Sequence, residues 1–220
     1  MQLLQKLVIN QNLITRGFVG ALFTIISLGI IVNTILMIPL IERSFNEIYK
    51  TSYSEEFLIE FPIVIYVLIT VFTQLFFLLL HCSFFTLINL LLINYFKETK
   101  KGNKKTIFIF FLSGDLFFLL QMFFQTGMLY INGIESVHGP NDLIISFGLN
   151  NILNSDNFLF NRITYSITPF SILYFTFIYN QNLNSYLLGK MESVLVSVLL
   201  FFIWLTMKVW DPLGVNVNIL

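Results

Sequence analysis

The sequence predicts an all-α fold: a polytopic membrane helical bundle of five transmembrane helices, forming a single membrane domain over residues 1–220. Of the 220 residues, 56% are hydrophobic and only 11% are charged, and the mean hydropathy is +0.81. Soluble domains carry about 25% charged residues, so this chain has too few ions to cover a water-facing surface. The apolar residues gather in long segments and the lysines gather in a short loop, and these two patterns predict the spans and their orientation.

Five segments have the roughly 20 mostly apolar residues that a transmembrane helix needs. They cover residues 18–40, 62–96, 106–131, 163–180 and 193–210. The first is longer than the apolar region of a cleaved signal peptide, and no small-x-small cleavage site follows it, so we expect it to be retained. The second would form a helix of about 52 Å. Because no Gly or Pro lies between Val64 and Phe96, we predict one long helix that is tilted or projects from the bilayer.

The last two segments carry local signals. Pro169 is expected to bend the fourth span, because proline removes a hydrogen bond inside a helix. Trp204 and Trp210 lie near the end of the fifth span and suit an aromatic belt at the membrane surface.

The predicted connections differ in length and character. Residues 41–60 are expected to form a polar loop, and residues 132–162 form the longest loop, with the turn HGPND at 138–142. The apolar stretch 143–153 is too short to span a bilayer. We therefore expect it to lie in the interface or to fold back over the bundle.

Lysine and arginine positions predict the orientation, since short loops rich in these residues stay in the compartment of synthesis. The predicted inner segments hold eight such residues: Lys6, Arg16, Lys97, Lys100, Lys101, Lys104, Lys105 and Lys190. The outer segments hold four: Arg43, Lys50, Arg162 and Lys208. The N-terminus is thus expected inside and the C-terminus outside. The five lysines of the loop KETKKGNKK could also attract anionic lipid headgroups, although topology alone is a sufficient role for them.

Polar residues inside the predicted spans form the candidate functional site. Thr70, Gln74, His81 and Asn89 lie within about a third of the circumference of the second span, at 100° per residue. Polar groups in lipid find partners within the protein, so this stripe predicts a buried face. Asp115 lies roughly 14 Å deep in the third span, and we expect the antiparallel second span to reach that depth near Thr86 and Leu87. The predicted intramembrane polar cluster is Gln74, His81, Asn89, Asp115 and Gln121.

Three interpretations of Asp115 stay open. The favoured one is structural: Asp115 hydrogen-bonds Thr86 or Asn89 and fixes the packing of two helices. The second is a proton or ion relay that uses Asp115 and His81, with Gln121 and Gln125 nearby. The third is a contact with a partner subunit.

No reaction chemistry is indicated. The two histidines, His81 and His138, and the single Cys82 give no metal-ligand spacing, and no phosphate-binding loop, nucleophile elbow or zinc-protease motif is found. His138 is interpreted as a turn residue. One cysteine forms no internal disulfide, and a net charge of zero does not indicate nucleic acid. We expect no catalytic residue, no cofactor and no metal site.

The order of the parts resembles a known family. The short basic loop KKGNKKT is followed by a third span, by ISFGLNNILNSDNFLFNRITYSITPFSILYFTFIYNQNL, by a turn ending LLGK and by a last span ending IWLTMKVW. Over roughly residues 18–210 this order is similar to that of the five-span Yip-type family (Ypt/Rab-interacting membrane proteins), in particular its bacterial branch. The resemblance implies five spans. Eukaryotic members bind small GTPases, act in vesicle traffic and have a long cytosolic N-terminal region. About 17 residues precede the first span here, so GTPase binding is not expected.

The expected function is therefore non-enzymatic: an integral membrane scaffold or accessory subunit of Yip type, organising a membrane complex or a lipid environment. Its expected partners are membrane lipids and other membrane subunits, and its expected location is the bacterial cytoplasmic (inner) membrane. Two alternatives stay open. One is a small transporter or channel with a polar path at Gln74, His81, Asn89 and Asp115. The other is an embedded subunit of a respiratory or secretion complex.

Overall fold

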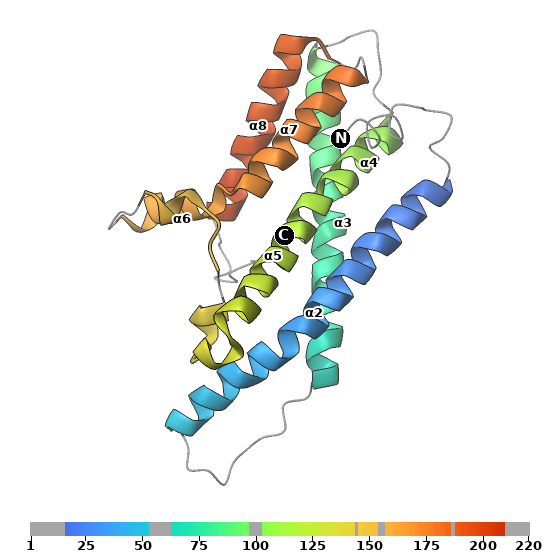
Figure 1. The fold of residues 1–220 in the computed structure, drawn as a ribbon. Helices are drawn as coiled ribbons and strands as arrows, with labels where there is room; N and C mark the ends of the chain where they lie inside the picture. Colours follow the sequence, from blue (N-terminus) through green and yellow to red (C-terminus); the bar gives the residue numbers. More distant parts are fainter. Residues whose placement is uncertain are drawn as a thin grey trace.

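The computed structural model describes residues 16–52, 63–96, 103–143, 145–153, 157–185 and 188–209, and all regular structure within them is helical (Figure 1). The larger helices are α2 (Arg16–Ser52), α3 (Ile63–Phe96), α4 (Lys104–Gly114), α5 (Leu116–Asn132), α7 (Pro169–Asn184) and α8 (Lys190–Val209). The shorter ones are η2 (Ile134–Ser136), η3 (Pro140–Leu143), η4 (Leu149–Asn151) and α6 (Phe158–Ser166).

Four helices in the described parts of the chain are long and apolar enough to cross a membrane. They are Gly17–Ser44, Val64–Phe96, Lys104–Asn132, which combines α4 and α5, and Lys190–Val209. This character is compatible with a multi-pass membrane protein.

Helix α3 forms the centre of the bundle and contacts α2, α4 and α8 (Figure 1). Helix α7 packs beside α8 and also reaches α4 and α5. The first turns of α4 and α8 lie at the same end of the molecule (Figure 1). We call this end, which carries Lys104 and Lys190, the lysine end.

Apolar side chains divide between the interior and the outer faces of the long helices. Ile26, Leu78, Phe85 and Leu200 are completely or almost completely buried in one continuous core. Other large apolar side chains point outward, and Phe72 is 72% exposed. Exposed apolar faces of this extent are expected where lipid replaces water.

The second predicted segment is confirmed as one helix, because α3 is uninterrupted over 34 residues. The third predicted span is interrupted at Asp115, between α4 and α5. The backbone hydrogen bonds nevertheless continue through the interruption: the Asp115 N–H donates to the Phe111 carbonyl at 3.0 Å, and the Leu119 N–H donates to the Asp115 carbonyl at 3.0 Å. The break is therefore local, and α4 and α5 together form one long element.

The predicted polar loop at 41–60 is wrong for its first part. Helix α2 continues through Pro39 and ends at Ser52, while residues 53–60 lie outside the described parts of the chain. Polarity signals departure from the apolar core, but it does not end a helix. The stretch after Leu40 contains no Gly or Pro before Ser52, so nothing in the local sequence stops helix propagation.

The predicted bend at Pro169 is also wrong, because Pro169 begins a helix. It occupies the first turn of α7, where a missing N–H costs nothing, and the preceding Thr168 forms a capping box with Ser171. The predicted span 163–180 is therefore divided between the end of α6 and the start of α7. Helix α7 has 16 residues, or about 24 Å, which is shorter than the other candidate spans.

The apolar stretch 143–153 was predicted to lie in the interface or to fold back over the bundle. Its first residues do fold back over the bundle. Leu143 and Ile145 pack against a small cluster that includes Leu40 and Leu129, and the Ile145 carbonyl accepts a hydrogen bond from the side-chain amide of Gln125 at 3.0 Å. His138 is exposed in the turn, and its backbone N–H donates to Asp142.

Trp204 does not belong to an aromatic belt. Its side chain is only 4% exposed and stacks on Phe118 with ring centroids 6.0 Å apart. The position of Trp204 near the end of a span does not reveal which way its side chain faces, and in the structure it faces the neighbouring helices. Trp210 lies outside the described residues.

Candidate functional site

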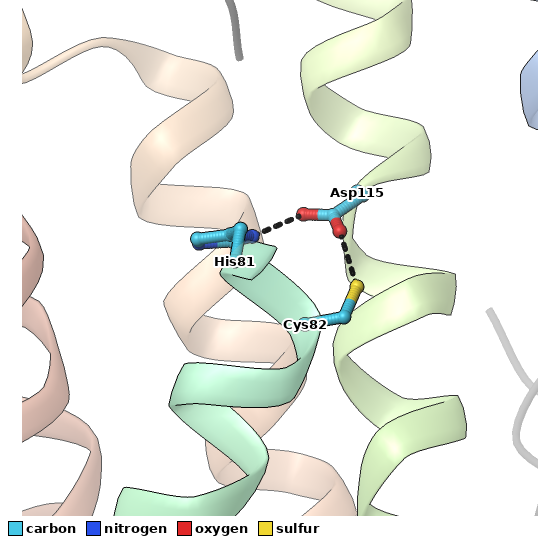
Figure 2. A network of polar contacts seen from close by, with 3 residues as sticks. All are labelled: His81, Cys82 and Asp115. Carbon is cyan, nitrogen blue, oxygen red and sulfur yellow. Dashed lines mark hydrogen bonds and ion pairs between the residues drawn. The ribbon is translucent and has the colours of Figure 1, made fainter. Parts of the chain in front are cut away.

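Three chemically reactive side chains meet in the middle of the bundle, and we call them the HCD cluster. His81 and Cys82 come from α3, and Asp115 comes from the junction of α4 and α5 (Figure 2). Asp115 Oδ1 lies 3.2 Å from His81 Nδ1, and Asp115 Oδ2 accepts a hydrogen bond from Cys82 Sγ at 2.9 Å. Asp115 and Cys82 are completely buried, and the His81 side chain is 13% exposed. The acid is thus held between two neighbouring residues of another helix.

Thr86 and Asn89 were predicted as the partners of Asp115, and this prediction is wrong. The residues that contact Asp115 lie about one helical turn or more away from them along α3. Counting depth along two antiparallel helices assumes that both start at the same level. The actual contact falls at His81 and Cys82, so the helices are offset relative to that count. The direct contact between Asp115 and His81, on which the relay interpretation depended, is present.

The polar atoms of the HCD cluster are only partly satisfied. His81 Nδ1 and Asp115 Oδ1 are close, but they lack the alignment of a hydrogen bond, and neither has a hydrogen-bond partner elsewhere in the described residues. His81 Nε2 has none there either. A buried polar group without a hydrogen bond costs about 1–3 kcal/mol. The cluster therefore holds unused ligand atoms in an enclosed place.

Aromatic rings surround the cluster. The His81 ring lies 4.7 Å from that of Phe85, 5.8 Å from that of Tyr174 and 6.4 Å from that of Phe118, between centroids. Tyr174 is completely buried, and its hydroxyl has no hydrogen-bond partner among the described residues. Gly114 allows Tyr174 to approach: a Cβ there would lie 2.7 Å from Tyr174 Cε2. These rings place apolar surface around His81.

The other predicted site residues lie apart from this contact. Asn89 pairs with Asn182 of α7, each amide donating to the other, at 3.2 and 3.4 Å, and both residues are completely buried. Gln121 accepts a hydrogen bond from the Thr168 hydroxyl at 3.1 Å. Of the five predicted cluster residues, only His81 and Asp115 are brought into direct polar contact in the part of the chain that the structure describes.

Gln74 lines a separate space, which we call the amide cavity. Its volume is about 170 Å³. The amide and threonine side chains around it are those of Asn33, Thr34, Thr70, Gln74, Gln125 and Thr126. Gln74 is 9% exposed, and its carbonyl oxygen has no partner among the described residues. The predicted polar stripe on α3 is thus confirmed as an inward-facing surface, but it serves several different contacts.

The predicted lysine set is described only in part. Lys97, Lys100 and Lys101 lie outside the described residues, while Lys104 and Lys105 occupy the exposed first turn of α4. Asn103 caps this helix by accepting a hydrogen bond from the Lys105 N–H at 3.0 Å.

A groove of about 570 Å³ opens beside this first turn, and we call it the lysine-end groove. It is lined mainly by apolar atoms of α2, α3 and α4, with Lys104 and Thr86 among its residues. Thr86 is 7% exposed, and its hydroxyl has no hydrogen-bond partner in the described parts of the chain. An apolar groove with Lys104 among its lining residues therefore lies at the lysine end.

Sequence reasoning missed Cys82, Tyr174 and Asn182 as site residues. Cys82 follows His81 directly, and this His-Cys pair was the available signal. Tyr174 and Asn182 come from a distant segment, and only the packing of α7 against α4 and α5 brings them near α3.

Comparison with protein-family models, with curated proteins and with solved structures gave no match. The resemblance to the Yip-type family therefore stays a prediction from the sequence.

Proposed function

We propose that this chain is an integral membrane scaffold or accessory subunit of Yip type without catalytic activity. The observation that carries the proposal is the use of buried polar side chains to join helices in pairs. Asn89 binds Asn182 between α3 and α7. The Thr126 hydroxyl donates to the Asn33 side chain at 2.9 Å, which joins α5 to α2. Interhelical hydrogen bonds of this kind stabilise helix bundles in lipid, where the hydrophobic effect does not drive the helices together.

Five crossings with the N-terminus inside remain part of the proposal. Helix α7 supports the fifth crossing, because it lies beside α8 (Figure 1) and buries Tyr174, Phe175 and Ile178 in the common core. The presence of both Lys104 and Lys190 at the lysine end supports the orientation. The proposed location is the bacterial cytoplasmic membrane.

Membrane lipids are the first proposed partner, and the lysine-end groove supports this role. An acyl chain would fill the apolar groove, while an anionic headgroup would meet Lys104 and the positive end of α4. The unpartnered Thr86 hydroxyl would donate to an ester oxygen of the same lipid.

Extraction in mild detergent, affinity capture and mass spectrometry test the scaffold role. Stoichiometric recovery of other membrane proteins supports it, and their identity would distinguish a free-standing scaffold from a subunit of a respiratory or secretion complex. Recovery of the chain alone, together with solute movement after its reconstitution into liposomes, would overturn the proposal.

A small transporter or channel is the second candidate, and the amide cavity favours it. The cavity is lined by hydroxyl and amide groups, among them that of Gln74. Gln74 lies about two helical turns from His81 along α3. Replacement of Asp115 by Asn separates the candidates. Abolished ion-dependent flux in a folded variant would support transport, whereas unfolding without any flux in the wild type would support a packing role.

A further inference from the structure

We propose that His81, Cys82 and Asp115 bind one zinc-type divalent metal ion and thereby join α3 to the junction of α4 and α5. The imidazole, thiol and carboxylate each offer one ligand atom, and these atoms all lie within 4.8 Å of one another. His81 and Cys82 of α3 both point toward Asp115 at the junction of α4 and α5 (Figure 2). This proposal replaces the expectation from the sequence that the chain has no metal site, and it does not depend on the scaffold role.

The two contacts of Asp115 are somewhat shorter than the ligand separations of a zinc site, so a bound metal would require the side chains to move slightly apart. Around tetrahedral zinc, with bonds of roughly 2.0–2.3 Å, neighbouring ligand atoms lie about 3.3–3.6 Å apart. The separation between His81 Nδ1 and Asp115 Oδ1 is 3.2 Å. The separation between Cys82 Sγ and Asp115 Oδ2 is 2.9 Å, so the thiol needs to move outward by only about half an ångström.

The orphaned atoms of the cluster are those that a metal would use. His81 Nδ1 and Asp115 Oδ1 approach each other without a hydrogen bond and have no other hydrogen-bond partner in the described residues. An ion between them would accept both lone pairs. A structural His–Asp pair would instead direct the imidazole N–H at the carboxylate.

Charge balance favours a divalent ion at this depth. A neutral imidazole, a Cys82 thiolate and an Asp115 carboxylate carry two negative charges, which one M²⁺ ion neutralises. The Cys82 thiol proton is released to the solvent when the metal–sulfur bond forms. The neutral product avoids the large cost of an isolated charge in an apolar interior, which matters because Cys82 and Asp115 are completely buried.

The ligand types select the metal class. Magnesium and calcium require oxygen ligands, and a nitrogen–sulfur–oxygen set does not suit them. A carboxylate is a poor ligand for copper(I), whereas zinc accepts all three types. Three protein ligands leave a fourth position for water. Tyr174, whose buried hydroxyl has no partner among the described residues, has its ring 5.8 Å from that of His81 between centroids.

Cobalt(II) provides a visible probe of this site in the full chain, purified in mild detergent with a tag that contains no histidine. We expect about one Co²⁺ per chain, a tetrahedral absorption spectrum with a thiolate-to-cobalt band, and displacement by Zn²⁺. Cys82→Ser should remove the thiolate band and weaken binding at least tenfold. His138→Ala is the matched control and should change nothing, because His138 lies in an exposed turn.

A second measurement uses the wild type alone, so it stands even where the Cys82 variant fails to fold. X-ray absorption of the zinc-loaded protein should show one sulfur at about 2.3 Å and nitrogen or oxygen atoms at about 2.0 Å. A shell without sulfur, or a monodisperse protein that binds no Co²⁺, would overturn the proposal.

Discussion

The HCD cluster and the Asn89–Asn182 pair are two polar contacts of the same buried helix, and they differ in how their hydrogen bonds are satisfied. Asn89 and Asn182 exchange donor and acceptor, so the amide nitrogen and the carbonyl oxygen of each side chain have a partner. In the HCD cluster, Asp115 receives one hydrogen bond from the Cys82 thiol, while both nitrogens of His81 have none in the described residues. In the first contact every side-chain polar atom has a partner, whereas in the second several have none among the described residues.

This difference separates packing from binding within one interface. Both sites lie between α3 and its neighbours, and both contain fully buried polar residues, so burial alone does not distinguish them. Reciprocal hydrogen bonds offset the free energy of desolvating the two buried amides, and no further molecule is required. Convergent but unaligned ligand atoms leave part of that cost unmet until an ion arrives.

The largest expected effect is stabilisation of the HCD cluster by zinc. At a free Zn²⁺ concentration 100 times its Kd, the folded wild type should gain about 2.7 kcal/mol, seen as a rise in Tm in detergent. Asp115→Asn should lose this gain because it removes an anionic ligand while keeping the side-chain shape. Asn89→Leu should keep it. An equal rise in Tm for all three proteins would show that zinc does not stabilise the fold through the HCD cluster.

The next effect concerns the aromatic wall of the HCD cluster. Gly114→Ala should destabilise the fold by about 1–3 kcal/mol, because the new methyl group would collide with Tyr174. Gly127→Ala is the control, since a Cβ there meets nothing within 4 Å and alanine favours the helix by up to about 1 kcal/mol. Thermal unfolding of the two variants in the same detergent measures the contrast.

A smaller effect is expected at the Asn89–Asn182 pair. Each single replacement by leucine leaves one buried amide without its partner, whereas the double replacement removes both. A double-mutant cycle in Tm-derived free energies should give a favourable coupling of about 0.6–1.7 kcal/mol, the range for hydrogen bonds between membrane helices. Zinc should leave this coupling unchanged. Coupling that depends on zinc would mean that the two sites act as one.

The smallest expected effect lies at the lysine-end groove. Lys104→Gln should weaken binding to vesicles or nanodiscs containing anionic lipid by about 1 kcal/mol, roughly fivefold. Native mass spectrometry of the bound lipid measures it. Arg162→Gln, at the opposite part of the bundle, provides a charge-matched control. Equal lipid retention by both variants would remove Lys104 from lipid binding.

Much of the helical plan could be predicted from the sequence, because long apolar runs leave few other structures. The single long helix of α3 was predicted from the absence of Gly and Pro, and it is confirmed. The errors arose where the residue composition of a segment did not indicate its conformation. Helix α2 continues into polar residues as far as Ser52, and Pro169 starts a helix where an interior bend was expected.

The candidate site could be predicted only as a set of buried polar positions. Asp115 and His81 were recognised because ionisable residues are costly in apolar surroundings. Their neighbour Cys82 was not recognised, since a lone cysteine in an apolar run has no periodic or charge signal. Tyr174 and Asn182 had no local signal that could connect them with α3.

The amino-acid sequence by itself determined that the described chain is helical and apolar, because long hydrophobic runs act locally along the chain. Only the tertiary structure decided that His81 and Cys82 face Asp115 while Asn89 faces Asn182. The physical reason is that helix offset and crossing depend on the fit of many side chains on several helices at once. A shift of one turn along α3 would exchange the partners of every polar residue without altering a single hydrophobic segment.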